Sequence, residues 1–169
     1  MTEVAFLGLL VGVAVQRLIE LRHSRHNEAR LFARGAREHA PQQVKWMKAV
    51  HGAWLAVIPI EVLVLDRPLI LPVAFVCLVL FLIGQMLRYA AMRGLGEHWS
   101  VRIITVPGAP VKTGGLYRWL RHPNYLGVVL EIAALPLVHG AWLSALVFTA
   151  LNGAVLVHRI RAEEKALTE

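Results

Sequence analysis

The sequence contains little cysteine and little charge. Its one cysteine, Cys77, lies inside an apolar run of a chain of 169 residues. A single cysteine excludes a disulfide framework and a cysteine-based metal site. Charged residues make up 17% of the chain and hydrophobic residues 57%, whereas a soluble globular protein has about 25% charged residues. This composition indicates a lipid environment rather than an aqueous one.

Acidic residues are scarcer than basic ones. The chain has 11 Asp and Glu against 18 Lys and Arg, which gives a formal net charge of +7. A nucleic-acid-binding domain would carry its basic residues beside a polar surface. Here long apolar runs separate the basic clusters, so we exclude nucleic acid as a partner. Glycine- and serine-rich linkers and internal repeats are also missing, and we expect residues 1–169 to form one domain.

Five apolar stretches approach the length of about 20 helical residues that a membrane span requires. They run from Val4 to Ile19, Ala49 to Leu65, Leu69 to Met92, Asn124 to Val138 and Trp142 to His158. The last two reach full length only if the fourth begins near Pro123 and the fifth continues past His158. Pro68 suits the start of the third helix and Gly140 the end of the fourth. The predicted fold is an all-α integral membrane bundle of five transmembrane helices, whose last two form a helical hairpin.

The basic residues fall on one side of these spans. Eight lie between Arg17 and Lys48, six between Arg88 and Arg121 and three in the segment 159–165, so that only Arg67 lies on the other side. The positive-inside rule then predicts an outside N-terminus and a cytoplasmic site. The segment from Arg17 to Lys48 is compatible with an amphipathic helix lying on the membrane.

The connection before the fourth span is rich in glycine and proline and ends on Arg121-His122-Pro123-Asn124-Tyr125. Pro123 suits the first turn of a helix, whose free amide donors would then stabilise an anionic ligand group. The alternative is an interfacial anchor, because tyrosine and arginine collect at headgroup depth in membrane proteins.

The fifth span leaves the membrane through a charged helical face. Arg159 and Glu163 are four residues apart and share this face with Asn152 and Leu156. Such a face can hold a zwitterion, whose carboxylate and ammonium groups would meet opposite charges. The commoner alternative is a solvated helix end with ordinary ion pairs. A complete dinucleotide fingerprint and a P-loop are missing, and the histidines of the first polar segment sit among arginines, so no metal site is predicted.

Taken in order, the motifs Thr113-Gly-Gly-Leu-Tyr117, Arg121-His-Pro-Asn-Tyr-Leu-Gly127 and Arg161-Ala-Glu-Glu-Lys-Ala-Leu167 resemble those of the isoprenylcysteine carboxyl methyltransferase family. The resemblance covers residues 88–167. It implies a membrane enzyme that uses S-adenosylmethionine, releases S-adenosylhomocysteine and needs no metal. The small size and the composition indicate a prokaryotic member in a plasma membrane.

The resemblance also implies roles for individual residues. Arg159 would contact the substrate and act in catalysis. The cofactor contacts would be Thr105, Val111, Lys112, Tyr117, His122, Pro123, Asn124, Tyr125 and Glu163.

Ionisable residues inside a span are functional hypotheses by default. A carboxylate acceptor would need only a positioning cation, whereas a phenol or an enol favours a general base. Glu131 is the candidate base, and Arg88 is a candidate substrate contact. The alternatives are that Glu131 pairs within the bundle and that Arg88 reaches the headgroups.

The predicted function is methyl transfer to a lipid-like acceptor, either an isoprenylcysteine-type carboxylate or the hydroxyl of a lipidic polyketide. Phosphatidylethanolamine N-methylation is the first alternative. A membrane reductase with a nicotinamide cofactor would need more helices than this chain supplies. The non-catalytic alternative is a scaffold whose arginines bind anionic membrane lipid.

Overall fold

The computed structural model describes residues 2–110 and 112–168 and is mostly helical. Its long elements within these residues are α1 (Glu3–Ala33), α2 (Gln42–Val64), α3 (Leu71–Leu95), α4 (Pro123–Leu137) and α5 (Trp142–Ala166). Two short 3-10 helices, η1 (Gly96–His98) and η2 (Gly115–Arg118), and two strands, β1 (Arg37–His39) and β2 (Ile103–Thr105), lie between them.

Four of the helices are long and apolar enough to cross a membrane: α1, α2, α3 together with η1, and α5. Their outer faces are apolar, as at the exposed Leu18, Phe75 and Leu146, while Phe6 and Trp54 are buried between helices. Together with the composition, this identifies an integral membrane protein. Helix α4 is also apolar but has only 15 residues, about 22 Å of helix against a hydrocarbon core of about 30 Å.

Local signals set several helix ends. Thr2 caps α1 by accepting a hydrogen bond from the Ala5 amide (3.3 Å), and Pro123 lies in the first turn of α4 as predicted. Gly140 follows α4 with φ +68°, a conformation that favours glycine. The prediction for Pro68 was wrong, because α3 begins at Leu71 and Pro72 occupies its first turn.

The first helix is longer than its apolar stretch predicts. It continues as one helix to Ala33, so the amphipathic surface helix expected over residues 17–48 was a wrong prediction. The reason lies in buried polar side chains on its second half. Asn27 donates to the Trp99 carbonyl (2.8 Å) and the Ser24 hydroxyl accepts from the Val101 amide (2.8 Å). These bonds make α1 a support for the chain that follows η1.

A small antiparallel sheet departs from the all-α prediction. Strand β1 pairs with β2 so that Glu38 lies opposite Ile104. An ion pair between Arg102 and Glu38 (2.7 Å) strengthens the contact. Each strand has only three residues, too few to produce an alternating pattern in the sequence.

Helices α3 and α4 pack backbone against backbone at two glycines. A Cβ atom at Gly127 would lie 2.7 Å from the Gly84 carbonyl oxygen and 2.6 Å from Cγ of Arg88. Small residues permit this close approach. Inside a bilayer no hydrophobic driving force holds helices together, so close van der Waals packing of this kind stabilises the pair. The first turn of α4 is thereby fixed relative to α3.

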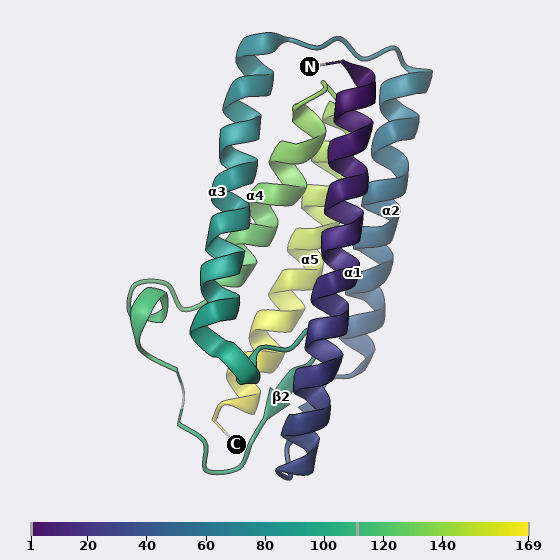
Figure 1. The fold of residues 1–169 in the computed structure, drawn as a ribbon. Coiled ribbons are helices and arrows are strands. Elements are labelled where there is room, and N and C mark those ends of the chain that lie inside the picture. Colours follow the sequence, from purple (N-terminus) through teal and green to yellow (C-terminus); the bar gives the residue numbers. More distant parts are fainter. Residues whose placement is uncertain (1, 111, 169) are drawn as a thin grey trace.

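The polar connections gather at one end of the bundle (Figure 1). The C-terminus, β2 and the long connection between α3 and α4 lie at the end opposite the N-terminus. The connection from α2 to α3 lies at the N-terminal end. One end therefore carries nearly all of the polar structure.

Candidate active site

The first turn of α4 and the last turns of α5 meet through Tyr125 and Glu163. The Tyr125 hydroxyl donates to Oε2 of Glu163 (2.5 Å). The His122 ring stacks on Tyr125 with a centroid distance of 5.4 Å, and its Nδ1 lies 3.8 Å from the same carboxylate oxygen. Two motifs that are far apart in the sequence therefore form one group of side chains.

Arg159 joins this group from the previous turn of α5. Its guanidinium lies over the Tyr125 ring, 5.8 Å from the centroid, and its Nη2 donates to the Val101 carbonyl (2.9 Å). The side chain is buried, yet Nε and Nη1 have no hydrogen-bond partner among the described residues. We call His122, Tyr125, Arg159 and Glu163 the signature cluster.

The start of α4 adds further polar groups to the cluster. Pro123 is buried and opens the helix, and its nitrogen carries no hydrogen, so the next free amide is that of Asn124. The Oδ1 atom of Asn124 and Nε2 of His122 are buried without a hydrogen-bond partner among the described residues. Nε2 of His122 lies 3.6 Å from Oε1 of Glu164, beyond hydrogen-bond distance. Buried polar atoms normally have partners, so both atoms are available to a polar ligand.

Tyr117 approaches the cluster from η2. Its hydroxyl donates weakly to the Ala91 carbonyl (3.4 Å), and its ring packs so closely that a Cβ atom at Gly94 would lie 3.2 Å from Cε2. Burial, and secondarily the Glu163 carboxylate, raise the pKa of Tyr117 to about 12. Tyr117 therefore remains a neutral hydrogen-bond donor at physiological pH.

Two further predicted cofactor contacts, Thr105 and Lys112, lie outside the signature cluster. Thr105 lies on β2 and its hydroxyl forms a hydrogen bond with Nε2 of His39 (2.8 Å). Lys112 is exposed in the connection after β2. Val111 lies outside the described residues. Their predicted roles stay predictions.

Glu131 and Arg88 come together in a second group, which also includes two residues of α1. Glu131 has no exposed surface (0%). Its Oε2 pairs with Arg17 and its Oε1 lies 3.3 Å from Nε of Arg88. Glu20 pairs with both arginines. We call Arg17, Glu20, Arg88 and Glu131 the quartet, and its opposite charges balance.

The sequence prediction missed Glu20 because it ended the first apolar stretch at Ile19, and it counted Arg17 only among the basic residues of the segment from Arg17 to Lys48. The sequence nevertheless contains a pattern that predicts a longer first helix. Polar residues recur at Gln16, Glu20, Ser24 and Asn27, a spacing of three to four that marks one helix face. This spacing predicts that the helix continues and turns a polar face toward its neighbours.

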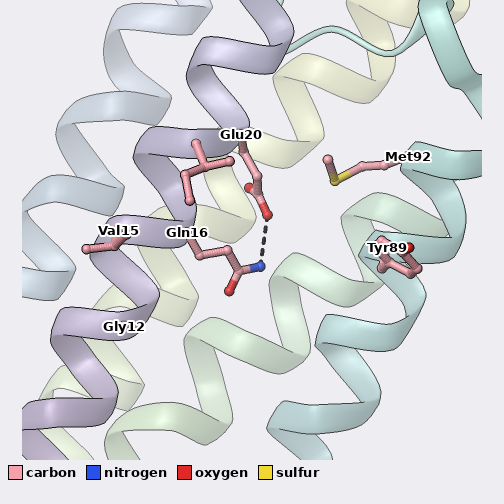
Figure 2. A pocket seen from close by; sticks show the side chains of 7 residues that line it. Gly12, Val15, Gln16, Glu20, Tyr89 and Met92 are labelled. Atoms are coloured by element: carbon pink, nitrogen blue, oxygen red, sulfur yellow. Dashed lines mark hydrogen bonds between the residues drawn. The ribbon is translucent and has the colours of Figure 1, made fainter.

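A groove between α1 and α3 opens beside the quartet. Its volume is about 310 Å³, and Figure 2 shows Gln16 and Glu20 facing Tyr89 and Met92 across it. Gln16 bonds to Glu20 (3.0 Å) and to Gln85 (2.7 Å). A second hollow of about 320 Å³ shares Tyr89 and Met92. It extends the groove to basic side chains near the polar end of the bundle, His23, Arg30 and Arg93.

Within the part of the chain that the structure describes, no group of His, Cys, Asp and Glu side chains is arranged to hold a metal ion. The signature cluster, the quartet and the groove are the candidate functional regions of the described chain. The described contacts of the quartet lie among α1, α3 and α4, whereas those of the signature cluster lie between α4 and α5.

Comparison with known proteins places this geometry in context. The model of the "Isoprenylcysteine carboxyl methyltransferase (ICMT) family" matches residues 76–169. The "Uncharacterized protein YpbQ" of Bacillus subtilis (strain 168) is 33% identical over 97% of both chains. An "Uncharacterized protein" of Haemophilus influenzae (strain ATCC 51907 / DSM 11121 / KW20 / Rd) is 35% identical over 44% of each chain. No solved structure matches the chain significantly.

Proposed function

The chain belongs to the isoprenylcysteine carboxyl methyltransferase family, and on this premise we propose that it transfers a methyl group from S-adenosylmethionine to a lipid-like acceptor. Family membership supports a membrane methyltransferase. The proposal of S-adenosylmethionine as methyl donor and of a lipid-like acceptor rests on one observation. The Tyr125–Glu163 hydrogen bond lies beside the buried Arg159, two of whose nitrogen donors have no partner among the described residues.

The residues of the signature cluster fit the polar part of the cofactor. Glu163 supplies a carboxylate for an ammonium group, and Tyr125 orients that carboxylate through its hydroxyl. The orphaned polar atoms of His122 and Asn124 provide further partners for a polar ligand. Pro123 positions the helix start whose amide donors favour a carboxylate. When bound, the cofactor supplies an electrophilic methyl group.

Arg159 is the proposed anchor for the acceptor. Its guanidinium has two donors free among the described residues, and burial strengthens a hydrogen bond to an anionic oxygen. A carboxylate acceptor would be held by these donors and needs no base. The reaction then depends on orientation, because holding two reactants in line removes much of the entropic barrier.

The groove between α1 and α3 supports an acceptor that arrives from the bilayer. Its walls include Val15, Ile19 and Met92, whereas Gln16 and Glu20 make it polar on one side. An apolar tail with a polar head fits such a surface. Glu20 lines the groove, whereas Arg88 does not but pairs with Glu20. Arg88 would therefore act on the acceptor through Glu20 rather than by direct contact.

The quartet points to a positioning role for Glu131. Its Oε2 pairs with Arg17, whereas its Oε1 lies 3.3 Å from Nε of Arg88 without a hydrogen-bond partner among the described residues. A proton taken up by the carboxylate would therefore weaken the charge pairing of the quartet. We propose that Glu131 holds α4 against α1 and α3. The predicted role of Glu131 as a base is the alternative, and its variant distinguishes the two.

The membrane arrangement is part of the same proposal. We infer that α4 completes a fifth span, forms a hairpin with α5, and leaves the signature cluster on the cytoplasmic side with the N-terminus outside. The gathering of basic residues at one end supports this orientation. The two bacterial relatives support a prokaryotic plasma membrane.

A methyl-transfer assay tests the function. Detergent-purified protein is incubated with methyl-labelled S-adenosylmethionine and three acceptors: a long-chain alkylresorcinol, an N-acetylated isoprenylcysteine and phosphatidylethanolamine. We expect label in the alkylresorcinol or the isoprenylcysteine. Label confined to phosphatidylethanolamine would support N-methylation instead, and an absence of label in all three, with no binding of S-adenosylhomocysteine, would contradict the methyltransferase proposal.

A further inference from the structure

The segment between η1 and β2 holds Arg159 through one backbone atom. The Val101 carbonyl accepts a hydrogen bond from Nη2 of Arg159 (2.9 Å). This bond joins α5 to a segment that follows α3 and η1 in the chain. A carbonyl can direct a guanidinium only if the segment that carries it is itself held in place. Whatever fixes Val101 therefore also fixes the direction of Arg159.

The carbonyl side of Val101 is attached to α1 through Ser100. The peptide unit that contains this carbonyl also contains the Arg102 amide, which donates to the Ser100 hydroxyl (2.9 Å). That hydroxyl donates in turn to Oε1 of Glu28 on α1 (3.0 Å). The bonds run in one direction from Arg159 to a carboxylate, and in such a chain each bond polarises the next. The carbonyl that meets Arg159 is thus a stronger acceptor than an unattached one.

The amide side of Val101 is attached to α1 through Ser24. The Val101 amide donates to the Ser24 hydroxyl (2.8 Å), and this hydroxyl donates to the same Oε1 atom of Glu28 (2.6 Å). A serine hydroxyl has one donor and two acceptor positions, so it can make both bonds at once. Ser24 is 1% exposed and Glu28 is 7% exposed, so water has little access to either group.

A salt bridge completes the attachment. Nε of Arg102 lies 3.1 Å from Oε2 of Glu28, and its Nη1 pairs with Glu38 on β1 (2.7 Å). Both carboxylate oxygens of Glu28 are therefore engaged by the segment 100–102. We call Ser24, Glu28 and the segment 100–102 the clasp.

We propose that Ser24 and Glu28 are positioning residues of the methyl transfer, which hold Arg159 in the direction that the acceptor requires. The inference rests on the proposed function, in which Arg159 anchors the acceptor, and adds two residues of α1 to that site. With Nη2 bonded to Val101, Nε and Nη1 of Arg159 have no partner among the described residues. The guanidinium is planar, and the Tyr125 ring lies 5.8 Å from its central carbon. One fixed nitrogen and one covered face therefore set where the two free donors meet an anionic oxygen.

The proposed cofactor contacts do not depend on the clasp in the same way. The hydrogen bond between Tyr125 and Glu163 joins α4 to α5 without a residue of α1. Loosening the clasp should therefore weaken the binding of the acceptor and leave that of the cofactor unchanged. A general loosening of the fold would impair both.

The test variant is Ser24→Ala, which removes the hydroxyl between the segment 100–102 and α1. Ser144→Ala is the matched control. The Ser144 hydroxyl also donates to a glutamate oxygen, of Glu61, at 2.6 Å, and its residue is 2% exposed. Ser144 lies fifteen positions before Arg159 on α5, about 22 Å along the helix. Both variants thus lose a similar buried bond, but only Ser24→Ala loosens the clasp.

Two further variants refine the test. Ser24→Thr keeps a hydroxyl at this position and should return the kinetics toward parental values. The same loss in Ser24→Thr as in Ser24→Ala would show that packing at this position matters rather than the hydroxyl. If Ser24→Ala does not fold in detergent, Ser100→Ala replaces it, because it removes the second path to Glu28 at a less buried position.

The first readout is steady-state kinetics with methyl-labelled S-adenosylmethionine and whichever of the three acceptors named above the parent methylates best. In Ser24→Ala, KM for the acceptor should rise about tenfold. KM for S-adenosylmethionine and the affinity for S-adenosylhomocysteine should stay at parental values. Ser144→Ala should keep both KM values, although it loses a similar amount of stability.

The second readout is independent of turnover. Hydrogen–deuterium exchange followed by mass spectrometry is measured for the peptide that contains residues 99–104. The backbone amides of Val101 and Arg102 should exchange faster in Ser24→Ala than in the parent and in Ser144→Ala, because local opening of this segment then breaks fewer bonds.

The outcomes separate this inference from the proposed function. Faster exchange with a parental KM for the acceptor would overturn the positioning role, and parental exchange in Ser24→Ala would overturn the clasp itself. A rise of both KM values, or the same kinetic change in Ser144→Ala, would show a purely structural effect and contradict the inference. A parent that neither binds S-adenosylhomocysteine nor transfers methyl would overturn the proposed function and with it the positioning role, whereas the exchange result would still show whether the clasp forms.

Discussion

The Tyr125 hydroxyl and the Glu163 carboxylate are joined by a hydrogen bond of 2.5 Å. This bond ties the start of α4 to the end of α5, and Arg159 contacts the same tyrosine ring from above. A carboxylate, a guanidinium and two orphaned polar atoms thus share one small region. These groups suit the binding of a zwitterionic ligand. A motif that only anchored the helix at the membrane interface would need none of these bonds.

The quartet predicts a large loss of stability for Glu131→Gln. The change leaves the buried Arg88 and the partly buried Arg17 with one carboxylate, and breaking a buried pair costs about 3–5 kcal/mol of unfolding free energy. Denaturant unfolding in detergent measures the effect. Adding Arg17→Gln restores the charge balance and should recover part of the loss.

The matched control for the quartet is Glu97→Gln, because Glu97 pairs with Arg34 at an exposed position (2.5 Å). We expect no measurable change in its melting temperature. If Glu131→Gln kept parental stability but lost methyl transfer, Glu131 would act as a base rather than as a positioning residue.

The contact between α3 and α4 predicts that Gly127→Ala is harmful. The new Cβ would lie 2.6 Å from Cγ of Arg88 and 2.7 Å from the Gly84 carbonyl oxygen. Overpacking of this kind costs about 1–3 kcal/mol, and the melting temperature in detergent should fall accordingly. Gly153→Ala is the control, since a Cβ there has open space and alanine favours helix by about 0.5–1 kcal/mol. Equal stability of the two variants would contradict the close packing.

The raised pKa of Tyr117 predicts a specific alkaline effect. In the unfolded chain this phenol has its ordinary pKa of 10.0, and in the folded protein the value is about 12. The unfolded state therefore ionises first as pH rises, and this part of the stability is lost between about pH 10 and 12. Melting temperatures of the parent and of Tyr117→Phe should converge over that range. A melting-temperature difference that stayed constant over this pH range would show that burial does not raise the pKa of Tyr117.

Four of the spans, the helix start at Pro123 and the face shared by Arg159 and Glu163 were predictable from the sequence. These follow from local hydropathy, from backbone restriction at Pro123 and from the helical spacing of Arg159 and Glu163, whereas the meeting of the two motifs was implied by the family resemblance. The partners of Glu131 were not predictable, because Arg17 lies more than 100 residues away in the sequence. The three-residue strands and the hydrogen bond from Asn27 to the Trp99 carbonyl depend on contacts between distant parts of the chain. No local sequence pattern predicts such contacts.

The orientation predicts the outcome of cysteine labelling. Cys77 is buried, so a cysteine introduced at an exposed position should react selectively with a membrane-impermeant maleimide. Asp66→Cys in the connection between α2 and α3 should be labelled in intact cells. Lys112→Cys should be labelled only after the membrane is opened. The reverse pattern would contradict an outside N-terminus.

The most direct test of the central claim is calorimetric titration of detergent-purified protein with S-adenosylhomocysteine, repeated for Glu163→Ala and His122→Ala. The parent should bind, and each variant should lose at least about tenfold in affinity, about 1.4 kcal/mol, while its melting temperature stays near that of the parent. Parental affinity in both variants would contradict the placement of the cofactor at the signature cluster, and an absence of binding by the folded parent would contradict the methyltransferase proposal itself.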